Sequence, residues 1–472
     1  MKRPLIVLLV LYCLTPLSAL AARSLSFGLS GSDVTTLQNT LIAKGYLAAG
    51  KATGYFGPLT EAAIKKFQCD QNIICTGTRA FGYGVYGPKT QAALLGAGTA
   101  SQFEFSGWIP YWRTATGTAD TLPHLSQLTS VMPFGYTMKV NGTLADTANL
   151  TQEPWTSFIA AAKKANVRVI PTVMWGDGET IHRILSDTTK RIALEDEIAN
   201  VVKQNNFDGV DIDFEAKKHE TIDYFSTFLK GLDMRLGNKW LYCTIEARMP
   251  LDHRYSPGAK IPADAMDYAN DYVQLNKYCD RVEIMAYDQG TIDVHLNGLR
   301  PAPYAPVADP QWVEALVTLA AKSIAKNKII VGIPTYGYEY QVSLAPGSGF
   351  EYKRLWPFNP RYATEIAAQL GVTSARTNAG ELGFVYNPSV LAALAPVGAD
   401  STQTQQATPS TSVAQNSGSQ QTGAIQIVNY LTWSDAKAIA DKVALARKLG
   451  VRGVAVFKFD GGQDPAMWDV LK

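Results

Sequence analysis

The sequence predicts an α/β fold: a (β/α)8 TIM barrel with a small α+β insertion before its last strand, preceded by a small N-terminal three-helix domain. Two observations predict the barrel. Eight short apolar or β-branched runs alternate with helical patterns over about 370 residues. One of these runs also carries three carboxylates on a face that barrels ordinarily fill with Val, Ile or Leu. A repeat with a period of thirty residues predicts the helical domain.

The first residues have the pattern of a secretory signal peptide. Basic Lys2 and Arg3 precede an apolar run that ends in the small-x-small triplet Ala19-Leu20-Ala21. The alternative is an uncleaved membrane anchor, but the run is short for a membrane span, which favours cleavage. We therefore predict a signal peptide at 1–21, a secreted or cell-wall-associated bacterial protein, and no membrane partner after cleavage.

Charge and cysteine content narrow the possible partners. Without the predicted signal peptide, Lys plus Arg falls from 43 to 41 and equals the 41 Asp plus Glu, which argues against nucleic acid as a partner. Cys69 and Cys75 could close a short loop outside the cytoplasm, whereas Cys243 and Cys279 could pair or remain buried thiols. No C-x-x-C pair or His cluster indicates a metal, and we predict no cofactor.

Residues 25–97 form the predicted helical domain, joined to the barrel by a linker at 98–104. The stretches GYFGPLTEAAI at 54–64 and GVYGPKTQAAL at 84–94 each place a Pro in a first helical turn. An earlier helix begins near Ser32 and ends at Gly45. The segment 29–95 resembles the bacterial peptidoglycan-binding domain, which implies a cell-wall partner. The alternative is a helical spacer without a ligand.

The barrel is predicted over 105–472. Its eight expected strands are Phe105–Trp112, Ser130–Tyr136, Val167–Trp175, Phe207–Glu215, Leu241–Arg248, Arg281–Asp288, Ile329–Tyr336 and Gly453–Phe459. Helical patterns between them include Trp155–Ala165, Thr189–Asn205, Thr221–Leu236, Pro310–Lys326 and Ser434–Leu449.

The spacing breaks once, before the last strand, where we predict an insertion at 338–430. Its aromatic-rich stretches Phe350–Phe358, Gly383–Asn387 and Ile425–Trp433 indicate extra strands. The polar run at 399–422, rich in Gln, Ser and Thr, cannot bury a core, and we predict that it is disordered.

The fourth strand carries the chemistry. Alternate side chains share a face, so Asp211, Asp213 and Glu215 point into the barrel while the intervening apolar residues point outward. Glu215 falls at the carboxyl end of the strand, where barrel active sites lie. Close carboxylates raise each other's proton affinity, so Asp213 helps Glu215 keep the proton that a general acid needs. Asp208 is out of phase with the other three and starts the strand, which leaves a structural role open for it beside a functional one.

These residues form a recognisable signature. The run DGVDIDFE at 208–215 resembles the D-x-x-D-x-D-x-E signature of glycoside hydrolase family 18, the chitinase-type barrels. Met285-Ala286-Tyr287-Asp288 matches the M-x-Y-D element of that family, and the first and seventh expected strands also fit. The resemblance covers nearly all of 105–472 in the right order.

The resemblance implies retaining hydrolysis with assistance from the substrate. Glu215 would protonate the glycosidic oxygen, and the 2-acetamido carbonyl of the substrate would attack the anomeric carbon. Asp213 would orient the acetamido N–H, Asp211 would tune Asp213 and Tyr287 would hydrogen-bond the acetamido carbonyl. Met285 and Asp288 would line the sugar site.

Aromatic residues at strand ends are the expected sugar contacts. Many family members place a Trp on the last strand under the cleaved sugar, and Phe457 takes that position here. The other candidates for substrate binding are Trp108, Tyr111, Trp175 and Tyr336, for which burial in the core is the alternative. Glu246 and Arg248 could either line the site or form an ion pair with each other.

Three functions follow from this pattern. The first is a secreted hydrolase of peptidoglycan that cuts next to N-acetylglucosamine and is held at the cell wall by its N-terminal domain. The second is a chitinase with the same mechanism. The third is a non-catalytic glycan-binding protein on the same barrel, which the presence of Glu215, Asp213 and Tyr287 disfavours. We expect a monomer in each case.

Overall fold

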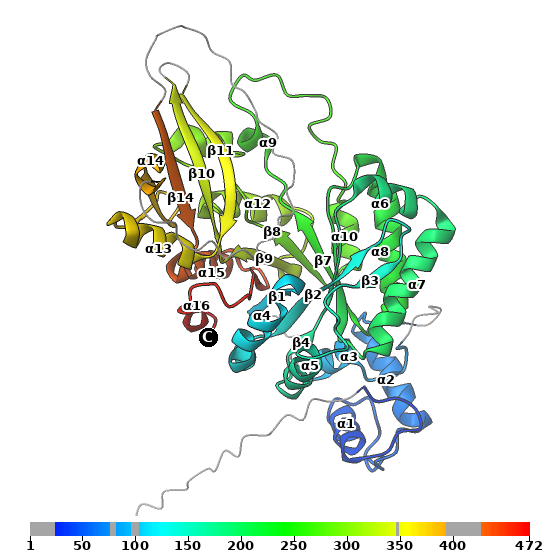
Figure 1. Cartoon of the computed structure of the whole chain (residues 1–472). Coiled ribbons are helices and arrows are strands. Elements are labelled where there is room, and N and C mark those ends of the chain that lie inside the picture. The colour runs from blue at the N-terminus through cyan, green and yellow to red at the C-terminus, as the bar shows by residue number, and fades with distance from the viewer. Residues whose placement is uncertain (1–23, 76–81, 96–102, 346–348, 393–425) are drawn as a thin grey trace, which may run out of the picture.

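The computed structural model describes residues 24–75, 82–95, 103–345, 349–392 and 426–472, and its large domain is the predicted barrel (Figure 1). The strands run in the order β1-β15-β9-β8-β7-β6-β5-β2, and parallel pairing of β1 with β2 closes the ring. They are β1 (Glu104–Pro110), β2 (Ser130–Met138), β5 (Thr172–Trp175), β6 (Gly209–Phe214), β7 (Trp240–Glu246), β8 (Arg281–Met285), β9 (Ile329–Pro334) and β15 (Gly453–Phe457).

Helices surround this ring. They are α4 (Thr114–Thr121), α5 (Trp155–Lys164), α6 (Gly178–Leu185), α7 (Thr188–Gln204), α8 (Ile222–Leu236), α9 (Leu251–Arg254), α10 (Tyr272–Tyr278), α11 (Val294–Leu299), α12 (Pro310–Ala320), α15 (Ala436–Leu449) and α16 (Met467–Val470). Two further short strands, β3 (Leu144–Asp146) and β4 (Arg168–Val169), pair with β2. Across the described ranges, no helix is both long and apolar enough to cross a bilayer.

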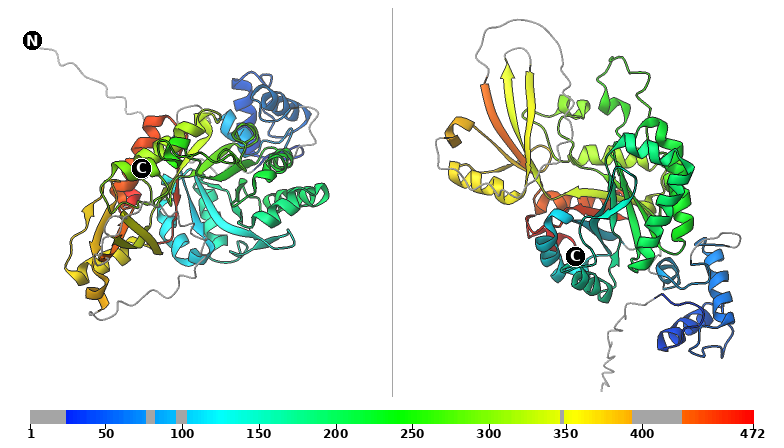
Figure 2. Two further views of the ribbon diagram at one scale, coloured as in Figure 1. Left: turned by 90° about the horizontal axis from the view of Figure 1, so that it is seen from above. Right: turned by 45° about the vertical axis from the view of Figure 1, so that its right-hand side comes forward.

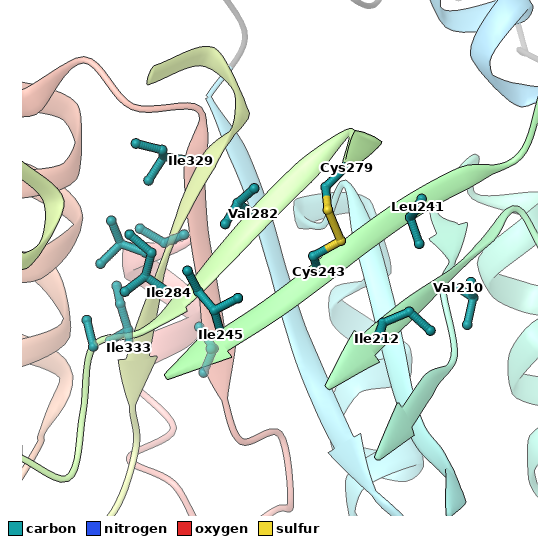
Figure 3. Close-up of a cluster of buried hydrophobic side chains, with 14 of the residues drawn as sticks. Val210, Ile212, Leu241, Cys243, Ile245, Cys279, Val282, Ile284, Ile329 and Ile333 are labelled. Carbon is teal, nitrogen blue, oxygen red and sulfur yellow. A yellow bond between two sulfur atoms is a disulfide. The ribbon is translucent and has the colours of Figure 1, made fainter. Parts of the chain in front are cut away.

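The alternation expected for barrel strands is present. Apolar side chains of β6 to β9, among them Val210, Ile212 and Ile245, point outward into the core beneath the helices (Figure 3). The opposite faces of the strands fill the barrel interior, where Trp108, Met132 and Tyr242 are buried together. Side chains alternate along β6, and Val210, Ile212 and Phe214 occupy its outward face. Its two aspartates therefore face the barrel interior.

The insertion is a second sheet of five strands in the order β11-β10-β14-β13-β12, which stands beside the barrel (Figures 1 and 2). One of its faces is covered by α13. Its elements are β10 (Gly337–Ala345), β11 (Gly349–Phe358), α13 (Pro360–Leu370), β12 (Ala375–Arg376), β13 (Leu382–Tyr386), α14 (Pro388–Ala392) and β14 (Gln426–Trp433).

The structure corrects three details of the sequence prediction. The third barrel strand is split into β4 and β5 around Pro171, which has no N–H to donate to a ladder. The helix predicted over Pro310–Lys326 ends at Ala320. Strand β10 directly follows the seventh barrel strand and was not predicted. The predicted signal peptide at 1–21, the low-complexity run at 399–422 and most of the linker at 98–104 lie outside the described residues.

The N-terminal domain has three helices, α1 (Ser32–Ala43), α2 (Pro58–Asp70) and α3 (Pro88–Leu94). Its thirty-residue repeat has a structural cause in two buried glutamines. Gln38 donates to Tyr55 O and to Thr60 Oγ1, and it accepts from Gly54 N. Gln68, thirty residues on, repeats the arrangement with the residues one period later: Val85 O, Thr90 Oγ1 and Gly84 N. Each glutamine thus ties a G-x-x-G-P turn to the helix before it.

This domain docks on the amino end of the barrel through α3. Asn238, just before β7, accepts from Thr90 N at 2.9 Å and donates to Val85 O at 2.7 Å. The Lys89 ammonium is buried between Asp280, at 3.0 Å, and Asp233, at 3.5 Å. The contact leaves no room for a side chain at position 82, where a Cβ would lie 2.6 Å from that of Asn238. The domain therefore sits at the end of the barrel opposite to Glu215.

Both cysteine pairs are disulfides, Cys69–Cys75 and Cys243–Cys279. The second pair joins β7 to the residue that follows α10, inside the apolar layer (Figure 3). The sequence left open whether Cys243 and Cys279 pair or remain buried thiols, and in the structure they are paired.

The docking contact can be tested with Asn238→Ala, which removes the side chain that bonds both Thr90 and Val85. The buried N–H of Thr90 would lose its acceptor, while Val85 O would keep the hydrogen bond from Gln68, so the free energy of unfolding should fall by about 1–3 kcal/mol. We expect calorimetry to show the N-terminal domain melting ahead of the barrel. Asn205→Ala is the matched control, since Asn205 bonds only Val201 O on the barrel surface. Equal stabilities of the two variants would refute the docking role of Asn238.

Candidate active site

Three acidic residues of the fourth barrel strand define the candidate site. Asp211 and Asp213 on β6 are buried, at 0% and 3% exposure, and Glu215 just beyond the strand is partly exposed. Ala216 then takes a positive φ of 53°, which turns the chain sharply away at the carboxyl end of the barrel. The acids therefore form a line from the barrel interior to the solvent.

Asp211, the deepest of the three, is held by neutral donors. Its oxygens accept from Trp108 Nε1 at 3.2 Å and from the hydroxyls of Thr172 and Thr244, both at 2.8 Å. These bonds lower the pKa of Asp211, but burial outweighs them and the net shift is upward. The three donors lie on β1, β5 and β7, so Asp211 links four strands of the ring.

A fourth carboxyl group, Glu283 on β8, completes this cluster. It is fully buried, and burial together with Asp211 raises its pKa well above the usual value. The raised pKa favours the protonated form of Glu283. Its Oε2 lies 3.2 Å from Thr244 Oγ1, which donates its own proton to Asp211. In the chain Glu283–Thr244–Asp211, a proton on Glu283 avoids a second negative charge beside Asp211.

Glu215 has the protonation expected of a general acid. Burial, followed by the nearby charge of Glu246, raises its pKa to about 7. Lys217 and a hydrogen bond with Asp213 lower this pKa, so the prediction that Asp213 helps Glu215 keep its proton is wrong, and burial and Glu246 have that effect instead. Near neutral pH, a large fraction of Glu215 therefore carries the proton that an acid catalyst gives away.

Asp213 lies between Asp211 and Glu215, and the charges of both affect its pKa. Burial, then Glu215 and Asp211, raise its pKa well above the usual value. Its Oδ1 is buried and has no hydrogen-bond partner among the described residues. A buried carboxylate oxygen without a donor is costly, so this atom is suited to receive a donor from a ligand.

Glu246 and Lys217 form an ion pair beside Glu215. Lys217 Nζ, fully buried, lies 3.5 Å from Glu246 Oε2 and also contacts Phe214 O. Glu246 accepts from Ala216 N at 2.8 Å and from Asn270 Nδ2 at 3.0 Å. Lys217 lowers the pKa of Glu246 despite burial, so Glu246 stays charged and acts on Glu215. The sequence prediction did not include Lys217, which lies beyond the end of β6.

The alternative ion pair between Glu246 and Arg248 does not form. The Arg248 guanidinium lies over the rings of Tyr268 and Tyr272, at 3.7 and 3.9 Å from their centroids, and donates to Asn270 O. Arg248 therefore supports the loop that follows β7, while Glu246 faces the acids.

The residues from 285 to 288 lie at the same end of the barrel. Met285 and Tyr287 are partly exposed, and Asp288 is exposed with a positive φ of 62°. Asp288 Oδ1 accepts from the hydroxyls of Tyr336 and Tyr338. Burial and the neighbouring carboxylates Asp213, Asp288 and Glu215 raise the pKa of Tyr287 well above the usual value, so its hydroxyl remains a donor.

Phe457 lies at the centre of the aromatic residues of the site. Its ring is stacked on Tyr287 with a centroid distance of 5.5 Å and meets Trp108 and Tyr336 edge-on at 5.9 and 6.1 Å. Phe457 is partly exposed, whereas Tyr336 is 5% exposed. Phe457 is thus placed where a sugar face could reach it.

Two predicted sugar contacts are placed elsewhere. Trp108 is 1% exposed and its indole N–H is bonded to Asp211, so it positions that carboxylate. Trp175 is 4% exposed and packs against Phe214 in the outer core, away from the acids. Tyr111 is partly exposed and packs against Trp112, which the sequence prediction overlooked although its side chain is 44% exposed at the end of β1.

The closed parallel barrel and the acidic residues of β6 are together typical of the glycosidase barrels of family 18. Residues 107–462 match the family described as "Glycosyl hydrolases family 18", and the chain belongs to this family. Residues 30–94 match "Putative peptidoglycan binding domain". Both assignments agree with the resemblances in the sequence.

Curated relatives match over part of their length. The chain is 28% identical over 166 residues to the "Uncharacterized glycosylase YvbX" of Bacillus subtilis (strain 168), covering 35% of this chain and 44% of the relative. It is 25% identical over 292 residues to the "Probable chitinase 2" of Drosophila melanogaster, covering 61% and 54%. The chain therefore spans about half the length of these relatives.

Solved structures confirm the fold. The spore cortex-lytic enzyme SleL of Bacillus megaterium QM B1551 matches at a TM-score of 0.55 and 21% identity, covering 78% of this chain and 73% of that one. The C-terminal domain of a putative chitinase from Desulfitobacterium hafniense DCB-2 matches at a TM-score of 0.58 and 18% identity, covering 78% and 99%.

The charge of Glu246 can be tested with Glu246→Gln. This variant keeps an acceptor for Ala216 N but removes the largest nearby charge that raises the pKa of Glu215, and it leaves Lys217 uncompensated. The pKa of Glu215 should fall, so the alkaline limb of the kcat/KM profile should move to lower pH. We expect the ratio of activity at pH 7 to activity at pH 5 to fall by about threefold to tenfold. Glu179→Gln, at a 77% exposed glutamate, is the control. An unmoved alkaline limb would contradict this assignment.

Proposed function

We propose that this protein is a secreted retaining glycosidase that cleaves β-linked N-acetylglucosamine polymers by substrate-assisted catalysis, with peptidoglycan as its substrate. The observation that carries the proposal is the line of acids from buried Asp211 to partly exposed Glu215, whose pKa is raised to about 7. Membership of family 18 supports the reaction class.

Catalysis begins with proton transfer from Glu215 to the glycosidic oxygen as the bond to the anomeric carbon breaks. The carbonyl oxygen of the 2-acetamido group of the substrate attacks that carbon and gives an oxazolinium intermediate. The leaving sugar departs with the proton. Glu215, now a carboxylate, takes a proton from the water that opens the intermediate, and the anomeric configuration is retained.

The remaining residues act on the acetamido group. Asp213 accepts its N–H through the unpartnered Oδ1, and the Tyr287 hydroxyl donates to its carbonyl oxygen. Asp211 and its three donors hold the negative charge behind Asp213. Met285, Asp288 and Phe457 line the sugar site. The substrate must therefore carry an N-acetyl group.

Peptidoglycan is favoured over chitin by the N-terminal domain, which matches a peptidoglycan-binding family. Docked on the barrel through Asn238 and Lys89, this domain would hold the active site close to the wall and raise the local substrate concentration. A chitinase with the same mechanism is the second candidate, since a matched relative is named a probable chitinase. The signal-peptide pattern at 1–21 and the two disulfides support secretion.

Glu215→Gln tests the reaction. Removing the transferable proton while keeping the shape of the side chain should lower kcat by about 10²- to 10⁴-fold. The measurement is reducing-end release from purified peptidoglycan and, separately, from chitin oligosaccharides. Glu220→Gln, five residues on and at an exposed side chain, is the matched control.

The wild-type protein separates the candidate functions in the same assay. Release from peptidoglycan supports the proposal, and release from chitin alone makes the protein a chitinase. Tight glycan binding with no release from either substrate would refute the catalytic role and favour a binding protein.

A further inference from the structure

An arginine of the inserted sheet lies beside the proposed sugar site. In the register of β10 and β11, Arg354 is directly opposite Tyr340, and Tyr352 is opposite Val342. Directly opposite residues share a face of a sheet, and Tyr340 and Val342 belong to the buried cluster that includes Tyr336 and Tyr287. Arg354 therefore lies on the face that is turned toward the site.

The guanidinium of Arg354 is held near Asp288. It lies 4.9 Å from the ring centroid of Tyr338, whose hydroxyl donates to Asp288 Oδ1 at 2.8 Å. The electrostatic effect agrees with this placement. Although the residue is exposed as a whole, its carboxyl group is enclosed, which raises the pKa of Asp288; hydrogen bonds from the two tyrosine hydroxyls and then the charge of Arg354 lower it. One aromatic ring thus separates Arg354 from a residue of the proposed sugar site.

Arg354 is a cation without a carboxylate partner. It is exposed, and within the described ranges no Asp or Glu oxygen lies within 4.0 Å of it. Two cations that follow barrel strands β6 and β15 are, by contrast, paired: Lys217 with Glu246, and Lys458 with Asp460. Asp288 is already stabilised by hydrogen bonds, since its Oδ1 accepts from the hydroxyls of Tyr336 and Tyr338. Arg354 therefore makes no direct ion pair with it. The planar guanidinium, held by a ring beneath it, is free to bind a carboxylate through two N–H groups.

We propose that Arg354 binds a carboxylate of the substrate and gives the enzyme its preference for peptidoglycan over chitin. Chitin is a neutral polymer, whereas the muramic acid units of peptidoglycan carry a lactyl group that ends in a carboxylate when free or in a peptide with its own carboxylates when substituted. Both sources present the same group to Arg354. This inference rests on the proposed function and names the feature of the substrate that this site selects.

The test compares Arg354→Ala and Arg354→Lys with the wild-type protein on four substrates. These are neutral chitin oligosaccharides, peptide-free glycan strands with free lactyl carboxylates, the same strands with their carboxyls converted to amides, and strands that keep their peptides. Lys353→Ala is the matched control, because Lys353 is exposed, carries the same charge and lies opposite Gln341 on the other face of the sheet. Thermal unfolding checks that each variant is folded.

We expect Arg354→Ala to lower kcat/KM on carboxylate-bearing strands by about 10- to 100-fold, mainly through KM. The loss should be less than about threefold on chitin oligosaccharides and on amidated strands. Arg354→Lys should recover part of the activity, since it keeps the charge but not the planar pair of donors. A loss on peptide-free strands identifies the lactyl carboxylate, and a loss confined to peptide-bearing strands identifies the peptide.

Other outcomes overturn the inference in distinguishable ways. Equal losses on charged and neutral substrates, or an equal loss for Lys353→Ala, would show that Arg354 does not select a carboxylate, while the proposed reaction would stand. A wild-type protein that cuts chitin but none of the peptidoglycan strands would refute both this role and the proposed substrate.

Discussion

The main constraint on this structure is the negative charge placed inside the barrel by the acidic face of β6. A carboxylate in a dry interior is unfavourable unless it is hydrogen-bonded or protonated. The protein uses both means. Asp211 accepts hydrogen bonds from three other strands, burial raises the pKa of Glu283 and so favours its protonated form, and the pKa of Glu215 is raised to about 7. The same arrangement that makes the charge tolerable leaves Asp213 with an oxygen that lacks a partner.

This constraint connects the folding of the barrel to its chemistry. The outward face of β6 supplies apolar side chains to the core beneath the helices, and this leaves Asp211 and Asp213 facing the interior (Figure 3). At the carboxyl end, positive φ angles at Ala216 and Asp288 turn the chain directly after the reactive residues. The inserted sheet stands beside this end and the helical domain is docked on the other. The proposed binding of the cell wall thus lies at the amino end of the barrel, and the proposed binding and cleavage of the substrate lie at its carboxyl end.

The sequence was sufficient to predict the barrel, its eight strands and the direction of the acids, because a two-residue alternation fixes which side chains share a face. It was not sufficient to predict contacts between strands. The parallel register brings Thr172 and Thr244 to Asp211 and Glu283 to Thr244, and the ion pair of Lys217 with Glu246 joins two separate strand ends. Aromatic residues at strand ends were also ambiguous: Trp175 entered the outer core and Trp108 the interior. The role of Asn238 in docking has no local pattern that could have revealed it.

The most direct test of this account is the anomeric configuration of the first product. Proton NMR of the reducing end, recorded during early hydrolysis of a β-linked N-acetylglucosamine oligosaccharide, distinguishes the anomers before they interconvert. The account predicts the β anomer, because attack by the acetamido carbonyl and then by water inverts the anomeric carbon twice. An initial α anomer would mean that water attacks directly, with no part for the acetamido group or for Asp213 as its acceptor.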